Sequence, residues 1–158
     1  DLHLSLRRQG QMCIRDSYEV KKRIKAFKPR PPDADDGSWR MAQSDAERVQ
    51  EFRKCIECFL CQDVCHVLRD HRLHDEFIGP RFFVHNAQLE MNPLDTEDRA
   101  HDLANDHGIG YCNITKCCTK VCPEEITITD NAIIPLKERV VDQLYDPVSR
   151  LLRVFSGG

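Results

Sequence analysis

Apolar residues recur at helical spacing through most of the chain after residue 43. The capping-box pattern S-x-x-E at Ser44 predicts that a helix begins there, runs through SDAERVQEFRK and ends just before Cys55. A glycine-proline pair ending at Pro80 precedes a second predicted helix, RFFVHNAQLEM, with apolar residues spaced for burial. Those apolar residues are Phe82, Phe83, Ala87, Leu89 and Met91.

A third helix is predicted to end at Gly108, a glycine suited to the left-handed conformation that follows many helices. Asp95 is its expected N-cap and Asp98 its third residue, and the helix runs to about His107. Strand signals are few, because the only β-branched run is ITIT at residues 126–129 and it is short.

The fourth predicted helix is capped by Thr129 or Asp130 and continues through Tyr145. Pro135 is tolerable only near its first turn, because proline lacks the donor that an inner turn needs. Its apolar residues at helical spacing are Ile133, Leu136, Val140 and Leu144. The fold class predicted from this pattern is all-α.

The pattern divides the chain into three parts. Residues 1–17 have no convincing period, and the QMCIRDS stretch resembles translated adapter sequence, so we interpret them as an artefact of sequence assembly outside the fold. Residues 18–43 are expected to be an extended connector, because the prolines of KPRPPDADDGS cannot donate hydrogen bonds. Residues 44–158 are the predicted helical domain.

Charge is unevenly spread along the 158 residues, whose formal net charge is −3. Residues 1–30 hold nine Lys/Arg and three Asp/Glu, whereas the remainder holds 14 and 23. A domain this acidic is poorly suited to bind nucleic acid, because phosphate contacts need basic side chains. The chain shows neither a signal peptide nor the roughly 20 apolar residues in succession that cross a bilayer, so we expect no transmembrane segment.

Eight of the nine cysteines lie in two short runs. The first run, CIECFLCQDVCH at residues 55–66, has the spacing C-x2-C-x2-C-x3-C, which is typical of bacterial iron–sulfur proteins. Where export is not indicated, clustered cysteines point to metal ligands rather than to disulfides. His66 stands where a proline commonly follows the fourth cysteine.

The second run, CNITKCCTKVCP at residues 112–123, repeats this spacing with one substitution. Aligned with the first run, its four ligand positions hold a cysteine, a threonine (Thr115) and two further cysteines, and a proline follows. Cys117 is one residue out of register, and as the neighbour of Cys118 it is expected to point elsewhere as a small buried residue.

In two-cluster ferredoxins the fourth cysteine of each run binds the other cluster. Applied here, the rule predicts a complete set of thiolates for a [4Fe–4S] cluster, namely Cys55, Cys58, Cys61 and Cys122. The other set has only three thiolates, from Cys65, Cys112 and Cys118. A cubane corner without a ligand tends to lose its iron, so Thr115 at that corner predicts a [3Fe–4S] cluster.

Other interpretations of the cysteines remain open. Zinc would make the chain a zinc-stabilised interaction module, although four-coordinate zinc leaves part of each run unused. Haem attachment needs C-x-x-C-H, and the stretch from Cys61 to His66 is one residue too long. Cys117 could complete a second four-iron cluster. No catalytic motif competes, and we interpret His71 and His74, in a charged stretch, as solvated.

Three stretches carry a family resemblance: RMAQSDAERVQEFRKCIECFLCQDVCHVLRDH, GPRFFVHNAQLEMNPLDTEDR and GYCNITKCCTKVCPEEITITDNAIIPLKERV. They resemble the C-terminal half of the iron–sulfur subunit of succinate dehydrogenase/fumarate reductase. The resemblance covers about residues 18–155. It implies an α-helical ferredoxin domain with a [4Fe–4S] and a [3Fe–4S] cluster in loops between helices, held by the same seven cysteines.

The resemblance also implies a function and partners. Such a subunit relays electrons between a flavoprotein subunit that carries FAD and a quinone, beside membrane anchor subunits. The substrate site would lie in the flavoprotein, and this chain would be peripheral on the cytoplasmic face of the plasma membrane. The family's [2Fe–2S] cluster belongs to an N-terminal domain, and the absence of a C-x4-C-x2-C run indicates that this domain is missing here.

Departures from better-known members fall near the expected quinone side. Where those members have a proline and a histidine, this chain has His66 and Asn113, which are therefore candidates to line that side. Two alternatives to this function stay open. One is the iron–sulfur subunit of another membrane-associated oxidoreductase, of the heterodisulfide-reductase or glycerol-3-phosphate dehydrogenase kind, although those subunits usually have two complete runs. The other is the zinc-binding module.

Overall fold

The computed structural model describes residues 18–34 and 36–147, and residues 1–17, our predicted extension, lie outside them. No strand occurs in the described residues, where an isolated bridge joins Pro29 to Asp95, so the all-α prediction is confirmed. The helices are α2 (Gln43–Arg53), α3 (Leu60–Asp63), α4 (His66–Arg69), α5 (Pro80–Glu90), α6 (Ala100–Asn105), α7 (Cys117–Lys120) and α8 (Ile134–Val140). The other helical segments are the 3-10 helix η1 (Ile109–Tyr111) and the π-helical η2 (Ile128–Ile133) and η3 (Val141–Tyr145).

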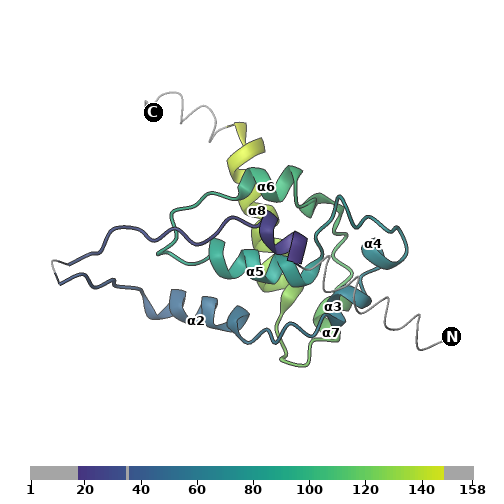
Figure 1. The fold of residues 1–158 in the computed structure, drawn as a ribbon, viewed down its shortest axis with the longest axis horizontal. Coiled ribbons are helices and arrows are strands. Elements are labelled where there is room, and N and C mark those ends of the chain that lie inside the picture. Colours follow the sequence, from purple (N-terminus) through teal and green to yellow (C-terminus); the bar gives the residue numbers. More distant parts are fainter. Residues whose placement is uncertain (1–17, 35, 148–158) are drawn as a thin grey trace.

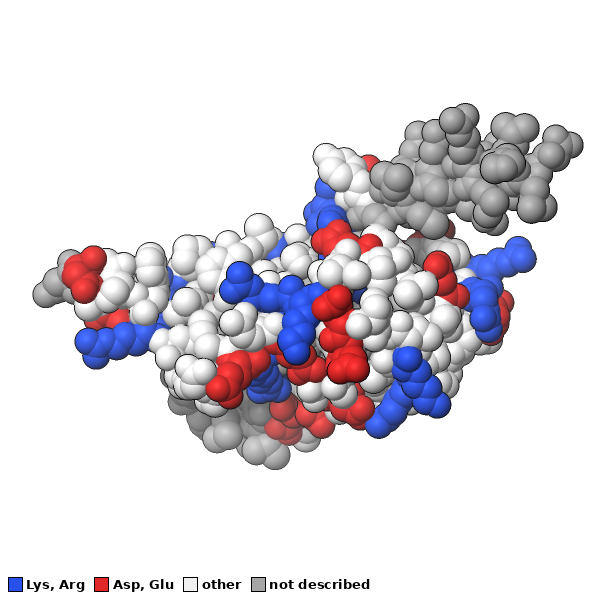
Figure 2. Space-filling model, turned by 90° about the horizontal axis from the view of Figure 1, so that it is seen from below, with Lys and Arg blue, Asp and Glu red and all other residues white. Residues whose placement is uncertain are grey.

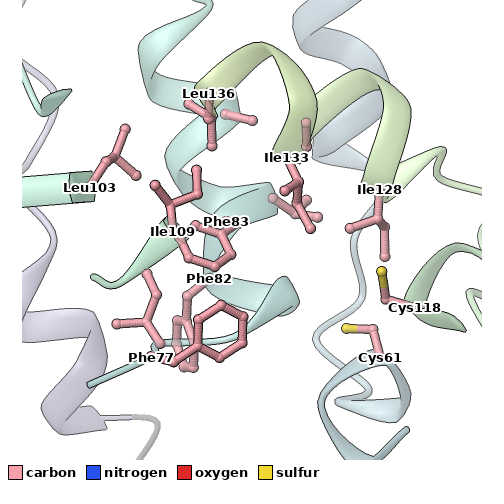
Figure 3. Close-up of a cluster of buried hydrophobic side chains, with 14 of the residues drawn as sticks. Cys61, Phe77, Phe82, Phe83, Leu103, Ile109, Cys118, Ile128, Ile133 and Leu136 are labelled. Carbon is pink, nitrogen blue, oxygen red and sulfur yellow. The ribbon is translucent and has the colours of Figure 1, made fainter. Parts of the chain in front are cut away.

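Helix α5 lies at the centre of the molecule (Figure 1). It packs against α2 and η2, while α6 packs against α8 and α3 against α7. Because α5 is surrounded, Phe83 and Ala87 are completely buried. Figure 3 shows that Phe77, Leu103 and Leu136 gather around this helix to form the core. The prediction of a buried helix after the glycine-proline pair is therefore confirmed.

Helix α2 begins differently from the prediction. Ala42 is its N-cap residue and no side chain caps it, so Ser44 lies inside the first turn instead of capping the helix. Gln43 supplies a local contact instead, donating from Nε2 to Oε1 of Glu47 over 2.9 Å. The helix still ends at Arg53, two residues before the first cysteine.

Helix α6 begins later than predicted. It starts at Ala100, with Arg99 as its N-cap residue and no side-chain cap. Asp95 accepts from the backbone of Lys28 in the connector, and Asp98 accepts from the backbone of Ala100. The helix also ends earlier than predicted, at Asn105, three residues before Gly108; that glycine has φ +63° and its place leaves no room for a side chain.

The C-terminal helical segment runs from η2 through α8 to η3. Thr129, an expected cap, is buried within the first turn of η2, and Pro135 is the second residue of α8, in the first turn of that α-helix. Proline removes one donor and crowds the preceding turn, and the wider π-helical turn at η2 directly precedes it. The ITIT run forms no strand; Ile126 and Ile128 are instead buried in the core.

The connector is held on the domain by a buried arginine. Residues 18–23 are helical, so the prediction of a fully extended connector is wrong for its first part. Arg99 donates to the backbone oxygens of Lys25 and Ala26 and pairs with Glu90 and Asp95. In the part of the chain that the structure describes, no helix has the length and apolar character that crossing a membrane requires.

Candidate iron–sulfur site

The two cysteine runs fold into the same local structure. In the first, Glu57 (φ 56°) and Phe59 (φ 63°) adopt the left-handed conformation, and α3 follows. In the second, Ile114 (φ 61°) and Lys116 (φ 60°) do the same, and α7 follows. These positions coincide when Cys55 is aligned with Cys112. The loops are therefore structural duplicates in the register read from the sequence.

The first hollow brings together four cysteines from both runs. The residues that line it are Cys55, Ile56, Cys58, Phe59, Cys61, Arg81, Val84, Cys122, Pro123, Glu124, Ile126 and Ile128. Cys61 is buried, whereas Cys58 is exposed and faces the surface beside exposed Ile56. Cys122, the fourth cysteine of the second run, lies with the first three of the other run.

The second hollow receives the fourth cysteine of the first run. Its lining residues are Cys65, His66, Val67, Phe77, Pro80, Cys112, Asn113, Ile114, Thr115, Lys116, Cys117, Cys118, Thr129 and Ile133. Thr115 takes the place that Cys58 has in the first hollow. Cys61 and Cys118 lie beside one another below Ile128 (Figure 3), so the two hollows are neighbours.

Cys117 does not point away as predicted, because it lines the second hollow and is half-buried. Its sulfur lies 3.4 Å from Oγ1 of Thr115. In the duplicated loop its counterpart is Leu60, which is 45% exposed and does not line the first hollow. The alignment of the two cysteine runs by their spacing therefore does not predict this fourth sulfur at the second hollow.

His66 and Asn113, predicted from separate runs, meet at the second hollow. Nδ2 of Asn113 lies 2.6 Å from Nε2 of His66, so the imidazole nitrogen accepts from the amide. His71 and His74 are exposed. Neither of the latter two lines a hollow, although the ring of His71 lies 6.5 Å from that of His66, so the first pair is the candidate for contact with a bound molecule.

Burial controls the protonation of the thiols. It raises the pKa of Cys61 to about 12, and the adjacent thiols of Cys55 and Cys118 add to this rise. Burial also raises the pKa of Cys65 and of Cys118. These thiols therefore hold their protons at neutral pH until a bound metal replaces them.

The donor sets fit clusters better than single ions. The eight cysteines of the two runs are free thiols, and sulfur ligands select zinc, copper or iron–sulfur clusters. Among residues 18–34 and 36–147, no three or more His, Cys, Asp or Glu side chains come close enough to hold one metal ion. Thiols spread around a hollow suit a group of several metal atoms, which is the property of a cubane cluster.

Three polar residues near the hollows were not found from the sequence. Thr129 places Oγ1 3.4 Å from the sulfur of Cys118 and is 1% exposed. Lys137 donates to the backbone oxygen of Cys112 over 2.5 Å. Arg81 lines the first hollow. The only signal for Arg81 is its charge in the first turn of a helix whose apolar residues are spaced for burial.

A helical domain in which two duplicated cysteine loops exchange their last cysteines is a ferredoxin-like domain for two clusters. Residues 51–126 match the family described as "4Fe-4S dicluster domain". The chain is accordingly an iron–sulfur protein with such a domain, related to the iron–sulfur subunits of succinate dehydrogenase and fumarate reductase.

Solved and curated relatives agree with this relationship. A structure titled "Mycobacterium smegmatis Sdh1 complex in the apo form" contains a chain of 57% identity and TM-score 0.77, covering 84% of this chain and 56% of that one. A component of the fumarate reductase (CoM/CoB) of Methanothermobacter marburgensis is 27% identical over 77% of this chain and 24% of its own length. The fumarate reductase iron–sulfur subunit of Shigella flexneri is 26% identical over 59% and 38%. The chain thus spans about a quarter to two fifths of the length of these curated relatives.

Proposed function

We propose that this chain is the electron-transfer part of the iron–sulfur subunit of a succinate dehydrogenase/fumarate reductase. Its first hollow would hold a [4Fe–4S] cluster through Cys55, Cys58, Cys61 and Cys122, and its second a [3Fe–4S] cluster through Cys65, Cys112 and Cys118. The clusters, when bound, supply one-electron transfer between a flavoprotein and a quinone. The observation that carries this proposal is the exchange of fourth cysteines between the two hollows.

Exposed apolar side chains lie at both hollows, and they support the proposal of two separate partners. Beside the first hollow, Ile56 is 60% exposed and Leu60 45% exposed, and Cys58 is exposed between them. Beside the second, Tyr111 and Ile114 are exposed near the pair formed by His66 and Asn113. Exposed apolar side chains at each hollow suit contacts with different partners.

The partners we propose are a flavoprotein subunit with FAD at the first hollow, and a quinone with membrane anchor subunits at the second. The chain would then lie at the cytoplasmic face of the membrane as a peripheral subunit. Figure 2 shows basic and acidic side chains interspersed on one face, without the single-signed surface that phosphate binding favours.

Cys117 supports a second candidate function. Because its sulfur lines the second hollow, that hollow could hold a second [4Fe–4S] cluster, as in other membrane-associated oxidoreductases. The register argues for three ligands, since Cys117 occupies the place of Leu60. The alignment of Cys117 with Leu60 therefore favours the three-iron cluster, whereas the presence of its sulfur at the second hollow favours the four-iron cluster.

Anaerobic reconstitution of the full chain with iron and sulfide tests these proposals. We expect the metal content of one four-iron and one three-iron cluster, together with the EPR signal of an oxidised three-iron cluster. Two four-iron clusters, one of them lost in Cys117→Ser, would establish the second candidate instead. Tight zinc binding without sulfide would overturn both.

A further inference from the structure

Arg81 places a buried guanidinium in the wall of the first hollow. It is the second residue of α5, its side chain is 4% exposed, and it stands among residues that line this hollow. Arginine is rarely buried to this extent unless it is paired. Its position at a cluster-sized hollow therefore needs a physical reason.

One end of the guanidinium is paired and the other is not. Nη2 lies 2.5 Å from Oε1 of Glu57, whose second oxygen pairs with Lys21 over 2.7 Å. Nε of Arg81 is completely buried and has no hydrogen-bond partner. A buried N–H group without an acceptor costs about 1–3 kcal/mol, so its acceptor is expected from whatever occupies the hollow.

We infer that Arg81 donates from Nε to a sulfur at the first hollow and raises the reduction potential of the cluster bound there. This inference rests on the proposed function, because it requires an iron–sulfur cluster at that hollow. Reduction adds one negative charge to the cluster. A fixed positive charge and an N–H donor stabilise the reduced form more than the oxidised form.

Glu57 offsets only part of this charge. Its side chain is 44% exposed, so water screens the carboxylate, whereas the guanidinium lies in a medium of low dielectric constant. Glu124 adds another carboxylate to the wall of the hollow. Removing the Glu57 charge should therefore shift the potential opposite to removing the Arg81 charge.

The charged residues at the second hollow differ from those at the first. Lys116 lines the second hollow, is 50% exposed and pairs with Asp130 over 2.7 Å, and Lys137 donates to the backbone oxygen of Cys112 nearby. An exposed, paired cation is screened by water. Arg81 lines the first hollow and not the second, so its effect should be larger on the first cluster, and the potential of the second serves as an internal reference.

Redox titration of the reconstituted full chain, followed by EPR with dithionite as reductant, tests this inference. At a fixed potential, we expect Arg81→Gln to lower the ratio of reduced to oxidised first cluster about tenfold, a shift of about 59 mV for one electron. Glu57→Gln should raise this ratio. Arg53→Gln removes an exposed positive charge two residues before Cys55 and is the matched control, for which we expect a much smaller change.

Iron and sulfide contents separate the possible outcomes. Failure of the wild-type chain to assemble a cluster would overturn the proposed function. Normal assembly with equal shifts in Arg81→Gln and Arg53→Gln would overturn the role of Arg81 alone. If Arg81→Gln fails to assemble, Glu57→Gln decides: a raised first-cluster ratio supports the inference, and an unchanged or lowered ratio refutes it.

Discussion

Replacing Arg99 by Met should destabilise the fold strongly. The Arg99 side chain is fully buried, and its partners Glu90 and Asp95 have side chains only 2% exposed. It also donates to the backbone oxygens of Lys25 and Ala26 over 2.9 and 2.8 Å. Methionine fills a similar space but leaves two buried carboxylates and two carbonyl groups without this partner.

Removing one partner of a buried ion pair costs about 3–5 kcal/mol, because the remaining charge is uncompensated. That is a large part of the roughly 5–15 kcal/mol that stabilises a domain. Arg139 offers a matched control, because it pairs with the same Glu90 over 3.1 Å but is 42% exposed. We expect Arg139→Met to cost less than about 1 kcal/mol.

Urea unfolding of the chain, monitored by circular dichroism, measures both free energies of unfolding. Limited chymotrypsin digestion adds a local measurement, because exposed Phe27 follows the connector backbone that Arg99 holds. Cleavage there should be faster in Arg99→Met than in Arg139→Met. Equal losses of stability in the two variants would refute the buried network as the anchor of the connector.

Three further predictions concern the hollows and the core. Thr115→Cys should convert the three-iron cluster to a four-iron cluster, with loss of the oxidised three-iron EPR signal; an unchanged signal would contradict the proposed register. Burial lowers the pKa of His107, so the unfolded chain alone binds a proton as the pH falls below 6.5, and the free energy of unfolding should decrease there. His107→Phe should remove this part of the pH dependence in urea titrations at pH 5 and 7.5, and an unchanged slope would count against it. Gly108→Ala should cost more than about 1 kcal/mol in thermal unfolding, because φ is +63° and the added Cβ would lie 1.9 Å from the backbone oxygen of Glu76; a neutral result would contradict the tight approach.

Features set by local chemistry were predictable from the sequence. The helical spacing of apolar residues after Pro80 was sufficient to predict α5, because that helix is buried in the core. The spacing of the cysteines was sufficient to group seven of the eight as the two hollows do, because each run encodes the same left-handed loop and short helix, but it did not place Cys117 at the second hollow. The positive φ angles of Glu57 and Ile114 were not predictable, because neither residue favours them.

Features set by distant partners could not be predicted. The sequence predicts that Asp95 caps a helix. Its carboxylate instead accepts from the backbone of Lys28 and pairs with Arg99, both of which the tertiary fold brings to it. The pairing of Arg81 with Glu57 likewise depends on the packing of α5 against the first cysteine loop. Such contacts override local propensity, and a single sequence contains no pattern that reveals them.

Because the fourth cysteines are exchanged, each proposed cluster would also cross-link distant parts of the chain. The first would tie Cys61 to Cys122, and the second Cys65 to Cys112, each closing a loop of roughly fifty to sixty residues. A disulfide that closes a loop of this length contributes about 4 kcal/mol in the chain-entropy model. Iron supply would then govern folding as well as redox chemistry. Because each cluster takes ligands from both cysteine loops, loss of either cluster would loosen both loops at once.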